Sequence, residues 1–442
     1  MEIRQDGNIY LSAMQLRRNA PVGFWAVFAV VFTLSLGGLV AVTIASVALT
    51  PKGEDAQGGD TQQYLAIGQS LAGGHGYKDM YGPWPDRPAY DRMPGWPAVI
   101  ALALRLAPGA EPLSVVRFAN AFCLALAGAL FSVLTRRFGG GRYISIFAGL
   151  AISFSPPLLY LSVLGWSEIC FVLFVALGMN GIFAGGRWLY WGALALGAGS
   201  LVRTNFAPVP LVFFCLASLL PSARRAMRKE RTFARLLLAC AIATTPTVFW
   251  AIRNDSVSGR FPLLSSLEGE TLYGANNEVV ANDLTVWGYW IMPDSIPGEP
   301  SKLSLAKTLP SDLALNDYYH HRAVLWMKGH LLAMPRLVLG KLVRGFAPIP
   351  WRPLIPSFLS FAWRFLLLAA YVALMPFWWS KISRIYLLLC LAMFLVDIVT
   401  IVVYYGSFRM THCFVEIFFV PCIFLGLQEY FKTRHGSPRG IR

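Results

Sequence analysis

Residues 23–49 read GFWAVFAVVFTLSLGGLVAVTIASVAL and contain no charged side chain. A helix needs about 20 apolar residues to cross the hydrocarbon core of a bilayer. Because lipid offers the backbone no hydrogen-bond partners, a crossing segment of this kind is expected to be helical. The run is also much longer than the ~7–15-residue apolar region of a cleavable signal peptide. We therefore expect an uncleaved membrane anchor.

Further apolar runs occur along the whole chain. Hydrophobic residues make up 56% of the 442 residues, charged residues only 14%, and the mean hydropathy is +0.53. Soluble domains carry about 25% charged residues. The sequence thus predicts an all-α integral membrane protein of about ten transmembrane helices. The predicted spans are 23–49, 114–135, 143–162, 167–185, 188–203, 205–220, 236–252, 355–379, 384–405 and 411–430.

The basic residues determine the predicted orientation. The net charge is +15, and Arg and Lys concentrate in short loops between apolar runs, as at 224–235. Cytoplasmic loops of membrane proteins are enriched in these residues. We expect a multi-pass protein of the cell (inner) membrane with both termini in the cytoplasm. The same placement of charge argues against a nucleic-acid partner.

Two long polar segments, at about 50–113 and 253–354, then fall on the external side. Long loops in compact proteins are usually functional or disordered, and the Trp, Tyr and Pro content of these two argues against disorder. Helical spacing at 60–72, 97–106 and 317–346 favours helices that lie along the membrane surface. Residues 1–442 are interpreted as a single transmembrane domain.

Asp60 follows the first predicted span and begins the helical stretch at 60–72. An aspartate in this place can cap the N-terminus of a helix. It can also act as a general base that accepts the proton of an acceptor hydroxyl. Spacing alone leaves both interpretations open.

Arg92 precedes the turn Met93-Pro94-Gly95-Trp96-Pro97, which returns the chain toward the membrane. A guanidinium held there can pair with a lipid phosphate, because its fork of N–H groups matches phosphate oxygens. The alternative is an interfacial arginine whose stem lies along apolar surface. Further arginines flank the predicted spans on the same side and allow the same two interpretations: Arg203, Arg253, Arg260 and Arg409.

Together the five arginines form a candidate site for a polyanionic headgroup. Candidates for contact with a sugar or an acceptor are Asp55, Tyr64, Glu168 and Asn254.

Charges inside the predicted spans are few, and each costs about 2.5–3.5 kcal/mol at the centre of a membrane helix. Arg364 and Asp397 lie at similar depth in neighbouring spans, so we expect a buried ion pair between them. The seven cysteines show no CxxC spacing, and His75, His320 and His321 lack spaced partners. We therefore expect no metal site.

Four motifs occur in order along the chain. They are Asp60-Thr61-Gln62-Gln63-Tyr64, Arg92-Met93-Pro94-Gly95-Trp96-Pro97, Phe249-Trp250-Ala251-Ile252-Arg253-Asn254 with its continuation to Asn277, and Ser407-Phe408-Arg409-Met410. In order and topology they resemble the GT-C superfamily of polyprenyl-phosphate-sugar-dependent glycosyltransferases. The likeness is greatest to the protein O-mannosyltransferase and lipid A aminoarabinose transferase branch, and it extends from the first predicted span to the last.

The resemblance implies a GT-C-like fold and an inverting sugar transfer on the external (periplasmic) face. Asp60 would be the catalytic base, Arg92, Arg203 and Arg409 would stabilise the departing phosphate, and Glu168 would orient the sugar or the acceptor. The implied partners are a polyprenyl-phosphate sugar, membrane lipids and a glycan, lipid or protein acceptor.

Two departures leave the metal dependence and the acceptor open. Thr61 stands where several members carry a second acid, and Arg92 stands where the aminoarabinose transferases carry Lys before a double proline. No cofactor is expected, and a divalent metal is not indicated. The rival prediction is a transporter or flippase for a lipid-linked saccharide, which would also use buried charges. Such proteins often contain inverted repeats and broken helices, and the sequence indicates neither.

Overall fold

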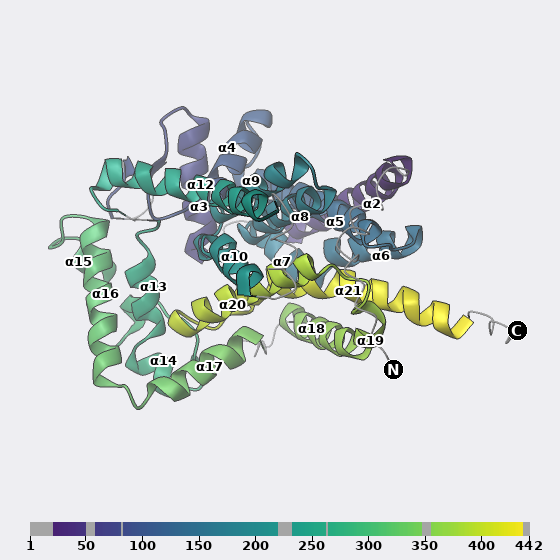
Figure 1. The fold of residues 1–442 in the computed structure, drawn as a ribbon. Coiled ribbons are helices and arrows are strands. Elements are labelled where there is room, and N and C mark those ends of the chain that lie inside the picture. Colours follow the sequence, from purple (N-terminus) through teal and green to yellow (C-terminus); the bar gives the residue numbers. More distant parts are fainter. Residues whose placement is uncertain are drawn as a thin grey trace, which may run out of the picture.

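The computed structural model describes residues 21–49, 58–80, 83–219, 232–261, 264–346 and 355–435 (Figure 1). Asp55 and most of the basic loop at 224–235 lie outside the described residues. In the described part the chain is almost entirely helical, with one two-stranded antiparallel sheet that pairs Lys78 with Pro88. The predicted all-α class is confirmed.

The elements follow one another along the chain as helices with a single hairpin near the start. They are α2 (Pro21–Leu49), α3 (Gly58–Ala72), β1 (Lys78–Asp79), β2 (Arg87–Pro88), α4 (Gly95–Leu106), α5 (Pro112–Arg137), α6 (Arg142–Ser153), α7 (Pro156–Leu164), α8 (Glu168–Ala184), α9 (Trp188–Ser200), η1 (Thr204–Phe206), α10 (Val209–Leu219), α12 (Thr232–Ser258), α13 (Glu268–Ala275), α14 (Glu278–Asn282), η2 (Pro293–Ser295), α15 (Lys302–Leu305), α16 (Asp312–Gly329), α17 (Met334–Phe346), α18 (Ile355–Ala373), α19 (Met375–Trp378), α20 (Arg384–Val403) and α21 (Phe408–His435).

Among the described residues, four helices are long and apolar enough to cross a membrane, within α2, α5, α12 and α20. The number becomes five if the bent pair α6–α7 is one span, and several shorter apolar helices accompany them. These helices indicate a membrane protein. The predicted number of about ten spans and the predicted orientation stay predictions.

The predicted span 143–162 is wrong as a straight helix. It is divided into α6 and α7, which meet at 45° around Ser155. Pro156 and Pro157 follow the break, and a proline lacks the N–H that would continue the helical hydrogen bonds. The predicted span 355–379 is likewise divided, into α18 and α19. The bend between α6 and α7 is therefore a broken span or a re-entrant loop that the sequence analysis did not predict.

Helix α5 lies at the centre of the apolar bundle. Its most apolar window is 72% buried, against 28% for those of α2 and α12. It packs against α2, α6 and α8, and its core positions include Leu124 and Phe131, both fully buried. The low burial of α2 and α12 fits helices that turn much of their apolar surface toward lipid.

A second group of helices, α13 to α17, stands beside the bundle (left in Figure 1) and has its own small core around Tyr273, Leu315 and Tyr319. The predicted helical stretches of both polar segments are confirmed as α3, α4, α16 and α17. Asp60 does not cap α3, because the helix already begins at Gly58 and the aspartate lies in its first turn.

Helices α8 and α9 approach so closely that only glycine fits. A Cβ on Gly181 would lie 2.6 Å from Cα of Gly192, and a Cβ on Gly192 would lie 2.6 Å from the carbonyl oxygen of Gly178. Small residues allow this approach between helices in a membrane, where packing rather than the hydrophobic effect holds them together.

Gly181→Ala is expected to push α9 away from α8 and to lower stability by about 1–3 kcal/mol, the usual cost of overpacking. The melting temperature of the purified protein in detergent measures the effect. Gly37→Ala in α2 is the matched control, since a Cβ there meets nothing within 4 Å. Equal melting temperatures for the two variants would contradict the close packing.

Candidate functional site

Five charged side chains meet where five elements begin or end. Asp60 comes from the first turn of α3, and Arg92 from the loop before α4. Glu168 is the first residue of α8, Arg203 directly precedes η1, and Arg409 lies in the first turn of α21. We call these five residues the arginine–carboxylate cluster. Since segments from position 60 to position 409 contribute to it, tertiary folding alone assembles it.

The cluster alternates in sign. Arg92 Nη2 lies 2.5 Å from Asp60 Oδ1, and Arg409 Nη1 lies 2.9 Å from Asp60 Oδ2. Nε of Arg409 lies 2.7 Å from Glu168 Oε1, and Nη1 of Arg203 lies 2.7 Å from the same oxygen. The Glu168 side chain is fully buried, whereas the other four are 14–26% exposed. The ion pairs thus run from Arg92 through Asp60, Arg409 and Glu168 to Arg203, and of these five only Glu168 is fully buried.

Aromatic and polar side chains hold the guanidinium groups in place. Arg409 stacks on Trp166 at 3.7 Å from the ring centroid, and Arg92 lies 5.1 Å from that of Tyr64. Such cation–π contacts are strongest where water is excluded. Arg92 Nε also donates to Gln63 Oε1 at 2.7 Å. The arginines are therefore oriented before any ligand arrives.

Asp60 is ionised in this setting. Burial alone would raise the pKa of its carboxyl group, but the guanidinium groups of Arg92 and Arg409 outweigh it and hold the pKa well below its usual range. Burial likewise opposes the charge on Arg92, and Asp60 offsets that and raises the pKa of the arginine. Three guanidinium groups share two carboxylates, so these five residues taken alone carry one more positive than negative charge, and Asp91 also lies within electrostatic reach of Arg92.

Behind Gln63 lies a second group of charges, centred on Arg87. Its guanidinium lies 2.9 Å from Asp79, 3.2 Å from Asp91 and 2.9 Å from Asp312. Gln63 donates to Asp91 and bridges the two groups. Asp312 opens α16, so Arg87 fastens the first polar segment to the second. The sequence analysis did not single out Arg87, and the adjacent opposite charges in Asp86-Arg87 and Asp91-Arg92 are the signal that could have drawn attention to it.

Arg253 and Arg260 do not join the cluster. Arg253 donates to the carbonyl oxygen of Ala89 and to Asn254 Oδ1, and it stacks against Tyr77 and Trp250. Arg260 pairs with Asp317 at 2.5 Å, with both side chains exposed. Of the candidates for sugar or acceptor contact, Glu168 and Tyr64 lie at the cluster.

Asn254 is fully buried beside Arg253. Of the five arginines that the sequence analysis singled out, the structure brings three together in the cluster: Arg92, Arg203 and Arg409.

The predicted ion pair between Arg364 and Asp397 is wrong. Arg364 donates to the carbonyl oxygen of Gly345 and to Thr411 Oγ1, whereas Asp397 accepts from Asn205 Nδ2 at 3.2 Å. Equal depth did not bring the two side chains together, because they face different neighbours.

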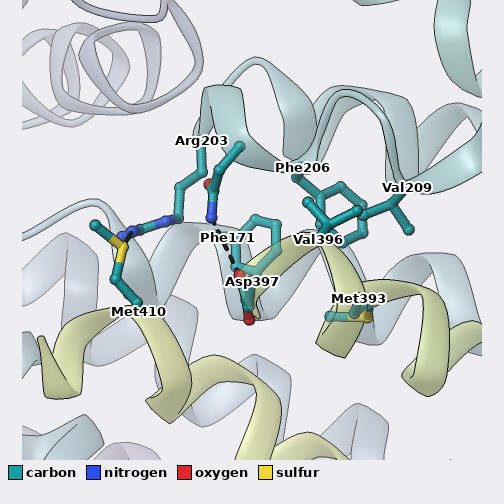
Figure 2. A pocket seen from close by; sticks show the side chains of 9 residues that line it. Phe171, Arg203, Phe206, Val209, Met393, Val396, Asp397 and Met410 are labelled. Atoms are coloured by element: carbon teal, nitrogen blue, oxygen red, sulfur yellow. Dashed lines mark hydrogen bonds between the residues drawn. The ribbon is translucent and has the colours of Figure 1, made fainter. Parts of the chain in front are cut away.

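Asp397 instead borders a cavity next to the cluster, with Arg203, Phe206 and Met410 (Figure 2). Figure 2 shows Asp397 and Met410 on the yellow-green helices, facing Arg203 and Phe206 on the teal segments. The cavity measures about 10 Å³, the space of roughly one water molecule. Most of the residues that line this water-sized space are apolar, and its polar members are Arg203, Asn205 and Asp397.

Within the ranges that the structure describes, no group of three or more His, Cys, Asp or Glu side chains is arranged to hold a metal ion. No protein-family model matches the chain, and no curated protein or solved structure is significantly similar to it.

Glu168→Gln is expected to lower the free energy of unfolding by about 3–5 kcal/mol, because it removes the buried carboxylate that Arg203 and Arg409 share and leaves Arg409 with Asp60 alone. The melting temperature in detergent provides the measurement. Asp317→Asn, which breaks the exposed pair with Arg260, is the control and is expected to cost at most about 1 kcal/mol. Equal melting temperatures for Glu168→Gln and Asp317→Asn would show that the buried ion pairs of Glu168 do not stabilise the fold.

Proposed function

We propose that the chain is a membrane glycosyltransferase that moves a sugar from a polyprenyl-phosphate donor to an acceptor hydroxyl by an inverting, GT-C-type mechanism. The observation that carries the proposal is the arginine–carboxylate cluster, where three guanidinium groups share two carboxylates at the ends of apolar helices. In the proposed arrangement about ten spans cross the cell (inner) membrane. Both termini are cytoplasmic, and the cluster opens to the external (periplasmic) side.

The charge of the cluster supports an anionic ligand. An excess guanidinium charge in a partly water-excluded site attracts an anion more strongly than it would in water. Arginine binds phosphate through paired N–H groups. The indole N–H of Trp166 is buried without a hydrogen-bond partner among the described residues, next to Arg409. It is a further donor for a phosphate oxygen.

In the proposed reaction Asp60 accepts the proton of the acceptor hydroxyl while that oxygen attacks the anomeric carbon. The bond between the anomeric carbon and the phosphate oxygen breaks, and its electron pair leaves with the phosphate. Arg92 and Arg409 stabilise this developing charge, which is usually the largest contribution to such catalysis. Attack from the face opposite the phosphate inverts the anomeric centre.

The resting geometry adds a step to this reaction. With two guanidinium partners and a lowered pKa, Asp60 is a weak base. A donor phosphate that binds Arg92 or Arg409 withdraws part of their charge from the carboxylate and makes Asp60 more basic. Glu168 keeps Arg203 and Arg409 aligned during this exchange. Tyr64, which lies at Arg92, is the candidate for sugar contact.

One observation favours a second function, the transport or flipping of a lipid-linked saccharide. The break between α6 and α7 lies in the apolar bundle, and Ser155 at the break donates to the fully buried Glu416 of α21 at 3.1 Å. Broken helices and buried carboxylates are common where transporters bind their substrates.

Asp60→Asn is expected to reduce sugar transfer by at least about 10²-fold, the lower range for loss of a general base. The assay supplies purified protein with a panel of polyprenyl-phosphate hexoses and pentoses and envelope extract as acceptor, and it measures free polyprenyl phosphate. Asp86→Asn is the matched control, because Asp86 is exposed and pairs only with Lys78 among the described residues. Near-normal turnover by Asp60→Asn would remove Asp60 from the mechanism.

The same preparation separates the two functions. In liposomes, a transporter moves the intact lipid-linked saccharide between leaflets and releases no polyprenyl phosphate. That result, with a wild-type protein that binds the donor, would overturn the glycosyltransferase proposal.

A further inference from the structure

Lys341 of α17 is a buried lysine that the proposed reaction does not use. Its side chain is fully buried, and its Nζ lies 2.8 Å from Asn276 Oδ1 and 3.2 Å from the carbonyl oxygens of both Val402 and Val403. Among the described residues no carboxylate pairs with it. Three acceptors match the three hydrogens of an ammonium group, so hydrogen bonds alone compensate the burial of this charge.

The hydrogen-bond acceptors of Lys341 lie at the ends of two helices. Val402 and Val403 are the last residues of α20, and the final carbonyls of a helix have no partner within it. A positive charge at this end also interacts favourably with the negative end of the helix dipole. Asn276, which accepts from Lys341, itself donates to the carbonyl oxygen of Val403. Lys341 therefore ties the end of α20 to the end of α13.

Three backbone segments also meet at Lys341 with no room for side chains. A Cβ on Gly406 would overlap the carbonyl oxygen of Lys341, and a Cβ on Gly288 would overlap its peptide nitrogen. The N–H of Gly406 donates to the carbonyl oxygen of Gly288 at 3.0 Å. Figure 1 shows α17 close to the end of α20, as this contact requires.

Both glycines adjoin residues that face the arginine–carboxylate cluster. Tyr289 follows Gly288, Tyr405 precedes Gly406, and the two rings pack edge to face at 5.9 Å. The electrostatic influence of Asp60 and Arg409 reaches both tyrosines. The chain then passes Ser407, whose Oγ accepts from the backbone N–H of Arg409 at 3.3 Å. The turn at 404–407 thus connects the Lys341 contact to the arginine shared by Asp60 and Glu168.

We propose that Lys341 is a positioning residue for the arginine–carboxylate cluster: by joining the end of α20 to Asn276 it fixes the 404–407 turn and so holds Arg409 where it can bind a phosphate. This inference rests on the proposed function. It assigns to α17 a role in ligand binding in addition to its place in the fold.

Three buried oxygen atoms depend on Lys341 for a hydrogen bond. Burial lowers the pKa of Lys341 to about 7, which shows how costly the charge is at this place. Without the lysine, the oxygens of Asn276, Val402 and Val403 would lose this donor in a buried place. We therefore expect the loss of Lys341 to loosen the 404–407 turn first.

The test compares Lys341→Met, which keeps an unbranched side chain of similar length and removes its donors, with Arg336→Met. Arg336 is the matched control because it is an exposed cation on the same helix. Asn276→Ala is the second variant, which removes the acceptor instead of the donor, in case Lys341→Met does not fold. Each full-length protein is measured in detergent for its melting temperature, for backbone hydrogen exchange across 404–410, and for affinity toward farnesyl phosphate.

The expected result for Lys341→Met is a lower melting temperature, because three acceptors lose their donor. Well below that temperature we expect at least tenfold faster exchange at 404–410 and at least fivefold weaker binding of farnesyl phosphate. Arg336→Met is expected to match the wild type in all three. Exchange at wild-type rates in Lys341→Met and Asn276→Ala would overturn the inference, and so would faster exchange with unchanged affinity.

Failure of the wild-type protein to bind farnesyl phosphate would count against the proposed function. In that case normal exchange in the variants would still overturn the positioning role, and faster exchange would support it as a property of the turn. Binding of farnesyl phosphate by the wild type therefore tests the proposed function, and hydrogen exchange in the variants tests the positioning role of Lys341.

Discussion

The chain of ion pairs from Arg92 through Asp60, Arg409 and Glu168 to Arg203 is the interaction on which the arrangement of the molecule depends. Each member comes from the end of a different element, so the ends of α3, α8 and α21 must meet for any charge to be compensated. A buried charge without a partner costs several kcal/mol. The cluster thus specifies how the apolar helices are aligned, which packing between apolar surfaces specifies only weakly.

Two contacts connect the polar segments to this arrangement. Arg87 fastens the first segment to α16, and Gln63 carries that contact to Arg92. Lys341 fastens the second segment to the end of α20. Arg87 thus joins the two polar segments five residues before Arg92, and Lys341 joins the second segment to the bundle at the end of α20, six residues before Arg409, so the loops act on the cluster through fixed contacts.

Many of the helices and most of the cluster residues could be predicted from the sequence. The predictions that were missed or wrong have identifiable physical reasons. The helices follow from the length of the apolar runs, and Asp60, Arg92, Glu168, Arg203 and Arg409 were found because a charge at the end of an apolar run is costly and conspicuous. Lys341 was missed because it lies in an amphipathic helix, where a lysine normally faces solvent. The pair of Arg364 and Asp397 was wrong because depth along a helix says nothing about its rotation. Pro156 and Pro157 did signal the break between α6 and α7, but the apolar run across them concealed it.

The composition of the cluster constrains its chemistry beyond a general preference for anions. If it served only to align helices, equal numbers of the two charges would compensate each other best, and a third guanidinium would be a cost. The three arginines and Asp60 remain 14–26% exposed, and Glu168 is fully buried. Arg409 stacks on Trp166, whose indole N–H has no hydrogen-bond partner among the described residues. A third guanidinium and an unused donor are costs for a cluster that only aligns helices, and both would serve a site that takes up a phosphate.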